Sequence, residues 1–254
     1  MNKRLVYPLI SLTTLLVSWE GLGRLFSFPN YILPVPSAIV EALVSDWHTL
    51  FKHSLVTLKE GVIGLVIASI LASILAILMD RFKGLQLAIY PHLVISQTIP
   101  MMVLGPLLTV WFGFGLTPKI LLVILMSFFP MAIAFFSGLQ QVDPKYIQLM
   151  KHYGASTWQI YQSVKIPKGL PGLLSGMRVA ATYCIGGAIV GEWLSASQGL
   201  GYYMIRVKNG YLMDKVFAAI LIVILLSLGL NLGVYGLEKL LQKKRMMTSV
   251  ESKN

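Results

Sequence analysis

Residues 143–171, DPKYIQLMKHYGASTWQIYQSVKIPKGLP, make up the longest polar stretch between the apolar runs of this chain, and we call them the 143–171 segment. Their pattern predicts two short helices. Asp143 is a favourable N-cap for the first helix, and Pro144 suits its first position, where the missing N–H costs nothing. Gly154 is a natural C-terminal stop for that helix.

A second short helix is predicted to follow. Ser156 and Gln159 have the S-x-x-Q spacing of a capping box, in which two side chains and two backbone N–H groups satisfy one another. We expect Pro167 and Pro171 to end this helix, with Ile166 held extended before the first proline. At about 1.5 Å per residue, neither helix is long enough to cross a hydrocarbon core roughly 30 Å thick.

Apolar side chains gather on one face of the first helix, while polar side chains occupy the other faces. The residues of this apolar face are Tyr146, Leu149, Met150 and Tyr153. Trp158 is the matching large apolar residue of the second helix. Two capped, amphipathic helices outside the bilayer are typical of a docking surface for another protein.

The composition excludes an ordinary soluble domain, because 56% of the residues are hydrophobic and 12% are charged. The net charge of +11 is compatible with nucleic-acid binding, but in an apolar chain basic residues more often flank membrane spans. We therefore predict no nucleic-acid partner. The one cysteine, Cys184, leaves no disulfide framework and is interpreted as a packed small residue.

Six apolar runs predict an all-α membrane protein with six transmembrane helices, at about 5–26, 54–79, 85–111, 119–139, 172–194 and 215–237. The first run could instead be a signal peptide. It is long for one and lacks an A-x-A cleavage site, so we favour an uncleaved span. We divide the chain into residues 1–53 (the first span and an outer interfacial helix capped by Ser37), a core of five spans at 54–240, and a basic tail at 241–254.

Small residues recur every four positions in two of the predicted spans, as Gly64, Ala68, Ala72 and Ala76 and as Gly172, Gly176, Ala180, Cys184 and Ala188. Such ladders let helices approach closely, so both are predicted to be packing seams. Glu20 and Arg24 lie one helical turn apart and are predicted to form a local pair. Lys59 and Glu60 lie near the end of a span, where charged side chains reach water.

Four polar residues inside predicted spans are candidates for a solute pathway. Gln97 and Thr98 precede a proline break in the third span, although ordinary bonding between helices explains them equally well. Arg178 and Glu192 lie in the fifth span, where a lipid-facing charge is costly. They are either pathway residues or structural pairs.

Basic residues indicate the orientation in the membrane. Thirteen lysines and arginines fall on the side of the 143–171 segment and seven fall on the opposite side or at the outer span ends. Because basic residues are enriched on the cytoplasmic side, we place the 143–171 segment and both termini in the cytoplasm.

The segment resembles the "EAA" loop, E-A-A-x3-G-x9-I-x-L-P, of ABC importer permeases. Gly154 and the V-K-I-P of 164–167 match in register, while Gln148, Leu149 and Met150 stand where the E-A-A is expected. Four further stretches resemble the nitrate/sulfonate/taurine branch of these permeases, so that the resemblance covers nearly the whole chain: LPVPSAIVEAL (33–43), TIPMMVLGPLLTVWFGFGLTPKILL (98–122), VDPKYIQLMKHYGASTWQI (142–160) and VGEWLSASQGLGYYM (190–204).

This resemblance implies a type I ABC importer permease in a bacterial inner membrane. Two permease copies, most simply identical ones, would form the pathway and dock onto a pair of cytoplasmic ATPase subunits, while an extracytoplasmic binding protein delivers the solute. The residues that it implies for ATPase coupling are Tyr146, Leu149, Met150, Tyr153, Gly154, Ser156, Trp158 and Pro167. ATP would be bound by the partner, because the chain has no G-x-x-x-x-G-K-[ST] motif.

No catalytic residue, metal site or cofactor is predicted for this chain, because H-E-x-x-H and Cys/His clusters are absent from its sequence. The stretches 95–100 and 180–197 most resemble permeases for thiamine-precursor pyrimidines; taurine, alkanesulfonates or nitrate are the alternative substrates. A secondary transporter is a distant alternative, since internal repeats and mid-membrane ionisable clusters are not evident. A membrane enzyme is a second distant alternative.

Overall fold

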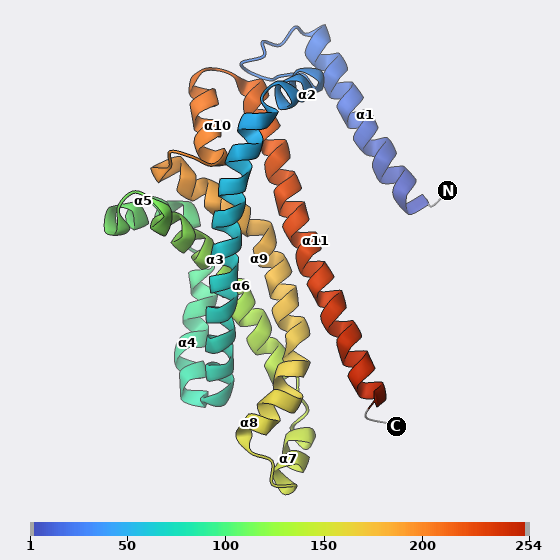
Figure 1. Cartoon of the computed structure of the whole chain (residues 1–254), viewed down its shortest axis with the longest axis vertical. Helices are drawn as coiled ribbons and strands as arrows, with labels where there is room; N and C mark the ends of the chain where they lie inside the picture. Colours follow the sequence, from blue (N-terminus) through green and yellow to red (C-terminus); the bar gives the residue numbers. More distant parts are fainter. Residues whose placement is uncertain (1–2, 252–254) are drawn as a thin grey trace.

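The computed structural model describes residues 3–251, and it describes their side chains except at 3–5, 101, 195 and 242–251. The described residues are helical or lie in short turns (Figure 1). The α-helices are α1 Lys3–Leu25, α2 Pro36–Ser45, α3 Trp47–Arg81, α4 Lys83–Ser96, α5 Met101–Phe112, α6 Leu116–Gln140, α7 Pro144–His152, α8 Thr157–Ile160, α9 Ile166–Ser195, α10 Leu200–Asn209 and α11 Met213–Glu251, with a π-helical turn, η1 Tyr161–Lys165, between α8 and α9.

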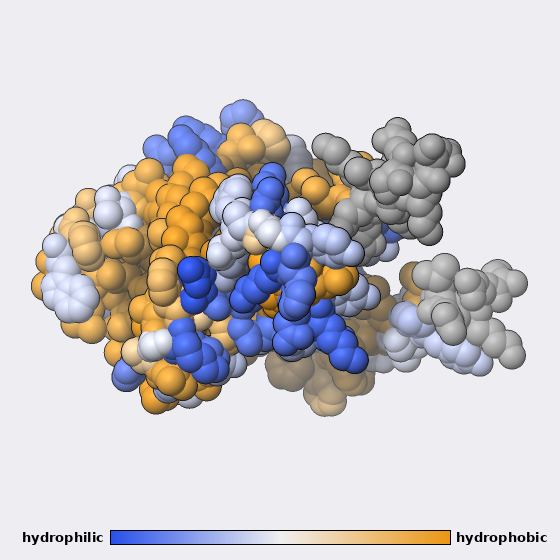
Figure 2. All heavy atoms as spheres, turned by 90° about the horizontal axis from the view of Figure 1, so that it is seen from below, coloured by the Kyte–Doolittle hydropathy of each residue, from blue (hydrophilic) through white to orange (hydrophobic). Residues whose placement is uncertain are grey.

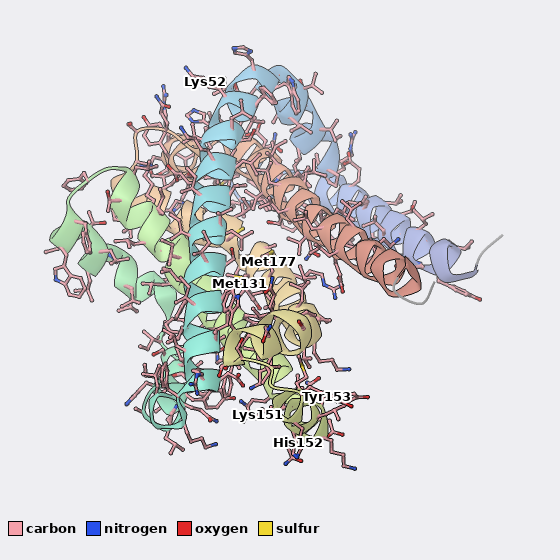
Figure 3. All side chains as sticks on the ribbon, turned by 60° about the horizontal axis from the view of Figure 1, so that its bottom comes forward. Lys52, Met131, Lys151, His152, Tyr153 and Met177 are labelled. Atoms are coloured by element: carbon pink, nitrogen blue, oxygen red, sulfur yellow. The ribbon has the colours of Figure 1, made fainter. Side chains whose placement is uncertain are left out.

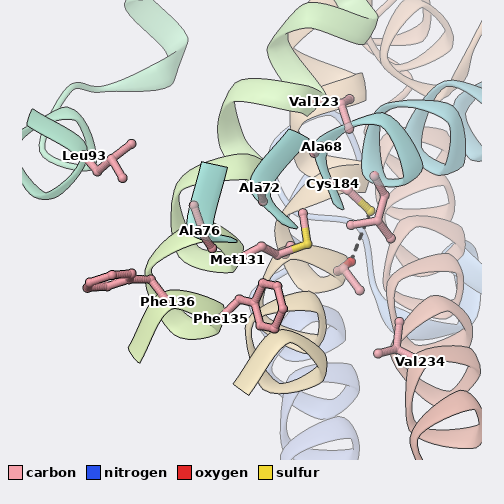
Figure 4. Close-up of a cluster of buried hydrophobic side chains, with 14 of the residues drawn as sticks. Ala68, Ala72, Ala76, Leu93, Val123, Met131, Phe135, Phe136, Cys184 and Val234 are labelled. Carbon is pink, nitrogen blue, oxygen red and sulfur yellow. Dashed lines mark hydrogen bonds between the residues drawn. The ribbon is translucent and has the colours of Figure 1, made fainter. Parts of the chain in front are cut away.

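Helices α3, α6 and α9 pack side by side and form the main core. The two predicted ladders lie in it: Ala68, Ala72 and Ala76 of α3 and Ala180 and Cys184 of α9 have no exposed surface (Figure 4). Larger side chains of α6, among them Met131 and Phe135, fill the space that these small residues leave. The predicted packing seams are therefore confirmed.

The seam between α6 and α9 is close because glycines of α9 face the backbone of α6. A Cβ atom added at Gly172 would lie 2.6 Å from the carbonyl oxygen of Ala134, and one added at Gly176 would lie 2.9 Å from the Cα atom of Met131. A larger side chain at either position would push the helices apart.

Four stretches of the described residues are long and apolar enough to cross a membrane: α3, α6, the continuous stretch Thr157–Leu194 and Met213–Leu241 of α11. The predicted third span is instead two shorter helices, α4 and α5, separated at residues 97–100. Pro100 lacks the N–H that would continue α4, and it precedes the first residue of α5. Helix α1 has 23 residues but is not among these four, so the count of six spans stays a prediction.

The outer interfacial helix is shorter than predicted and is capped differently. Helix α2 follows Val35 as its N-cap and ends at Ser45, and α3 already begins at Trp47 rather than at residue 54. Ser37 does not cap α2; its backbone N–H donates to Glu20 over 2.9 Å. Glu20 also pairs with Arg24 over 2.6 Å, which confirms that local ion pair.

Helices α2 and α10 lie at one end of the molecule, and α7 and α8 lie at the other (Figure 1). Helix α11 packs on α9 and α2, whereas α1 stands beside α11 and contacts α2. The division into 1–53, 54–240 and 241–254 stays a prediction. Residues 1–2 and 252–254 and the basic side chains from Lys243 to Arg245 lie outside the described residues.

Candidate functional site: the 143–171 segment and the helices around it

Helix α7 is closed at both ends by the predicted residues. At its start, the Asp143 side chain accepts a hydrogen bond from the Lys145 N–H over 2.9 Å. At its end, Gly154 adopts a φ of +76°, and its N–H donates to the Lys151 carbonyl while the Ala155 N–H donates to the Met150 carbonyl. This pair of bonds is a Schellman motif, which needs a residue such as glycine at the left-handed position.

The apolar face of α7 is exposed, and no residue of α7 is buried. Tyr146 is 63% exposed, Leu149 54% and Tyr153 84%, while Met150 is half-buried. Tyr153, Lys151 and His152 lie at the end of the molecule opposite Lys52 (Figure 3). Seen from that end, hydrophilic residues gather near the middle, while much of the remaining described surface is hydrophobic (Figure 2).

The second helix of the segment starts as predicted. Ser156 and Gln159 form the capping box, with the Ser156 N–H donating to Gln159 Oε1 over 2.7 Å and the Gln159 N–H donating to Ser156 Oγ over 3.3 Å. Trp158 follows in the first turn and is 68% exposed. Its side chain therefore adds to the exposed apolar surface that α7 begins.

The end of that second helix was predicted wrongly. Ile166 is helical rather than extended, and α8 runs through the π-helical turn η1 into α9, with Pro167 in the first turn and Pro171 inside α9. The Ile166 N–H donates to the Tyr161 carbonyl, five residues back. A π-helical turn is wider than an α-helical turn, so it accommodates the ring of Pro167 without ending the helix.

A pocket of about 360 Å³ lies near the break between α4 and α5. Gln97 from the break lines it together with α6 and α9, and the other lining residues are Leu125, Met126, Phe129, Pro130, Val179 and Tyr183. The side chains of this lining carry no charge at neutral pH, and Gln97 and Tyr183 supply its polar side-chain groups. We call it the Gln97 pocket.

The other pathway candidates do not join Gln97 in this pocket. The Thr98 hydroxyl donates to the Ile95 carbonyl over 2.7 Å. Arg178 pairs with Glu238 of α11 over 3.2 Å, so its charge is compensated by a neighbouring helix. The ion pair is compatible with a structural role, and a role of Arg178 in the pathway stays a prediction.

Glu192 lies at the other end of α9 and holds the start of α10. Its carboxylate accepts bonds from the Gly201 N–H over 2.6 Å and from the Thr57 hydroxyl over 2.7 Å, and Thr57 accepts from the Leu200 N–H over 2.8 Å. Glu192 is 1% exposed and lines a pocket of about 570 Å³ beside α10. The carboxylate thus ties α9, α3 and the N-terminus of α10 together.

Glu60 is likewise buried, against the expectation that it reaches water at the end of a span. It is 1% exposed and pairs with Lys119 of α6 over 2.7 Å. A buried pair of this kind satisfies both charges, and removal of one partner would leave the other buried and unpaired.

Comparison with known proteins identifies the family. Residues 64–246 match the family described as the binding-protein-dependent transport system inner membrane component. The chain belongs to this family. It is 36% identical, over 92% of each chain, to the formylaminopyrimidine transport permease protein ThiX of Halalkalibacterium halodurans. It is 25% identical to the taurine transport system permease protein TauC of Escherichia coli, over 94% of this chain and 90% of TauC.

A solved structure with the same fold is a chain of an amino acid ABC transporter. The TM-score is 0.61 with 18% sequence identity, and the match covers 80% of this permease and 96% of that chain. The family match and the curated relatives identify this chain as an ABC transporter permease, and its long apolar helices make it a multi-pass membrane protein. Its family implies a binding protein and an ATPase as partners.

Asp80 is a polar residue of the permease that the sequence analysis did not single out. Asp80 is the penultimate residue of α3, and its side chain has no exposed surface. A signal was present, because Asp80 is an acidic residue at the basic end of a long apolar helix. Among the described side chains, no group of three or more His, Cys, Asp or Glu residues could hold a metal ion.

Proposed function

We propose that this chain is the permease subunit of an ABC importer, and that the 143–171 segment docks onto a separate ATPase subunit. The observation that carries the proposal is the exposed apolar face of α7, which is capped at both ends and held outside the helix core. An amphipathic helix whose apolar face stays exposed among the described residues suits a groove on another protein. The anchors in this docking are Tyr146, Leu149, Met150, Tyr153 and Trp158, and Gly154, Ser156 and Pro167 set the path of the backbone.

The membrane topology belongs to the same proposal. We infer six spans with the 143–171 segment and both termini in the cytoplasm, since basic residues are enriched on that side. Two identical permease copies form the pathway, and an extracytoplasmic binding protein delivers the solute to the face that bears α2 and α10. Closure of the ATPase pair brings the two 143–171 segments together and opens the spans outward.

Docking is tested by affinity purification of the tagged chain from its own cells in mild detergent, followed by mass spectrometry. We expect a P-loop ATPase to co-purify. Replacing Tyr146 and Leu149 by Ala should reduce the recovered ATPase at least about tenfold, because truncated anchors at an interface cost roughly 2 kcal/mol or more. Gln148→Ala on another face of α7 is the matched control and should leave recovery unchanged. Equal recovery with all variants would refute the docking role.

For the substrate, we propose a neutral heteroaromatic ring of the thiamine-precursor pyrimidine class. The Gln97 pocket supports this, because its lining offers an amide, a phenol and apolar side chains without a cationic partner. An anion such as taurine's sulfonate would leave an uncompensated charge in this surrounding. The greater identity to ThiX than to TauC points the same way. Taurine, alkanesulfonate or nitrate transport is the alternative.

The binding protein that co-purifies decides between these substrates. Isothermal titration should detect binding of formylaminopyrimidine and hydroxymethylpyrimidine and no binding of taurine or nitrate. In uptake assays, Gln97→Leu should reduce pyrimidine transport. Gln86→Leu, in the preceding helix α4 and outside the pocket lining, should not. Binding of taurine or nitrate instead of the pyrimidines would transfer the assignment to the alternative.

A further inference from the structure

The Asp80 carboxylate is the centre of a buried cluster at the end of α3. Its Oδ2 atom accepts hydrogen bonds from the Tyr161 hydroxyl and from Lys165 Nζ, each over 2.5 Å. Its Oδ1 atom accepts a bond from Gln140 Nε2 over 2.6 Å. The Asp80 side chain has no exposed surface, and the Lys165 side chain is 15% exposed. The charge of Asp80 is therefore compensated within the protein rather than by water.

The three donors flank helices α7 and α8, on both sides. Gln140 ends α6 three residues before Asp143, and Tyr161 and Lys165 are the first and last residues of η1. Lys165 Nζ also lies 5.2 Å from the centre of the Tyr161 ring, so these two side chains approach the same oxygen together. The Asp80 carboxylate of α3 thus contacts the chain just before α7 and just after α8.

Direct packing of α3 on the helices of the 143–171 segment before α9 does not explain how α3 is connected to that segment. Helix α3 packs mainly on α6 and α9, and neither α7 nor η1 packs extensively on it. Asp80 therefore supplies the direct polar link between α3 and η1. The π-helical turn places both donors there, and such turns interrupt regular helices frequently at functional sites.

Helix α3 continues from this junction to the opposite end of the core without a break. Glu60 lies twenty residues before Asp80, about 30 Å away at 1.5 Å per residue. Near that end, Glu60 pairs with Lys119 and Thr57 bonds with Glu192, which holds the start of α10. One rigid element therefore connects the Asp80 cluster to the outer polar network.

We propose that Asp80 is a positioning residue that makes the 143–171 segment and α3 move as one body during transport. The inference rests on the proposed docking function. Movement of the segment on the ATPase would be passed through the Asp80 ion pair to α3 and along it to Glu192 and α10. Without the ion pair, the segment would move about the π-helical turn η1 and α3 would not follow it.

The test measures the distance between spin labels at Gln148 of α7 and Lys52 near the outer end of α3, with both sites changed to Cys in the purified complex with its ATPase. Buried Cys184 is changed to Ala in all variants. In the parent protein, the distance distribution should be the same without nucleotide and after trapping with ATP and vanadate. In Asp80→Asn, the trapped distribution should shift or broaden. The matched control Glu41→Gln, an exposed acid on α2, should behave as the parent does.

A second pair of variants distinguishes a positioning role of the ion pair from a general folding defect. Lys165→Met should reduce the stimulation of ATP hydrolysis by the co-purifying binding protein roughly 2- to 30-fold, the range for mutations that modulate coupling between sites. Lys165→Arg keeps the charge and should restore it. A spin-label distance that changes on trapping in the parent protein would overturn the proposal. So would an unchanged distance in Asp80→Asn together with normal stimulation of ATP hydrolysis in Lys165→Met. Failure of any ATPase to co-purify would instead refute the docking function.

Discussion

At the residue scale, Gly154 sets the geometry between the two helices of the 143–171 segment. Its φ of +76° lies where residues with a Cβ atom are strained, yet the space around it is open, because an added Cβ would meet no atom within 4 Å. Substitution there changes the path of the backbone rather than the core. The position therefore allows a test of the segment's geometry without loss of the fold.

We predict that Gly154→Asp leaves the protein inserted but lowers transport at least about fivefold, because a left-handed conformation costs residues with a side chain roughly 1–2 kcal/mol. ATP-driven uptake in proteoliposomes measures the loss, and the amount of protein in the membrane measures insertion. The control is Gly84→Asp, since Gly84 is also open but lacks a positive φ. Full uptake by Gly154→Asp would show that the geometry of this stop is unimportant.

Asp46, between α2 and α3, is a carboxyl group outside the predicted spans whose pKa is shifted by its partners. Although burial opposes its ionisation, hydrogen bonds from the Tyr203 hydroxyl over 2.6 Å and from Lys215 Nζ over 3.2 Å hold the pKa of Asp46 below its ordinary value. Burial and the bond to Asp46 also raise the pKa of Tyr203. The folded state therefore favours the ionised carboxylate.

Because the folded pKa of Asp46 is lowered, its stabilising effect is present above the unfolded value of about 3.9 and is lost as pH falls through the folded pKa. Asp46→Asn should be less stable than the natural protein by about 1–2 kcal/mol near pH 7, on the scale of hydrogen bonds to charged groups. Thermal unfolding in detergent should show this difference shrinking below about pH 4. A difference that is constant with pH would contradict the assignment.

At the scale of elements, the seam between α6 and α9 determines how the core is built. Its ladder of small residues could be predicted from the sequence, because a four-residue period alone defines one helix face. The caps of α7 and α8 could be predicted for a similar reason: a cap depends on residues within one turn. The continuation of α8 through Pro167 could not be predicted. The π-helical turn that admits the proline is held by Asp80, which lies 81 and 85 residues from its two partners in that turn.

In the candidate site, too, local features could be predicted from the sequence and contacts between helices could not. Exposure of Tyr146, Leu149 and Trp158 was predictable from the amphipathic pattern. The partners of Glu60 and Glu192 were not, because Lys119 and Thr57 come from other helices, 59 and 135 residues away in sequence. Local periodicity indicates which face of a helix is apolar, whereas pairs between helices depend on register and depth, which a single sequence does not fix.

For the α6–α9 seam, we predict that Gly176→Ala destabilises the protein and that Gly186→Ala in the same helix does not. An added Cβ at Gly176 would lie 2.9 Å from Met131 Cα and 3.0 Å from the Pro130 carbonyl oxygen, whereas one at Gly186 would meet nothing within 4 Å. Overpacking costs roughly 1–3 kcal/mol, and both changes gain the same helix propensity. Thermal unfolding of both variants makes the comparison, and equal midpoints would argue against a close seam.

At the scale of the whole molecule, the permease places the exposed helix α7 and the Asp80 cluster at one end, a buried polar network near the other end, and a packed three-helix core between them (Figure 1). Helix α3 contributes to all three regions through Asp80, the Ala68–Ala76 ladder and Glu60. This arrangement suits a transporter in which movement of the helices at one end changes the conformation at the other end. In the proposed assembly, the ATPase subunit hydrolyses ATP and this chain transmits the movement.

The measurement that tests this account most directly is solute uptake by proteoliposomes that contain the permease with its co-purified ATPase, together with the binding protein. We predict uptake of a thiamine-precursor pyrimidine that requires both ATP and the binding protein, and that is lost when Tyr146 and Leu149 are replaced by Ala. Uptake by the permease alone, driven by an ion gradient and indifferent to those substitutions, would contradict the account and support a secondary transporter.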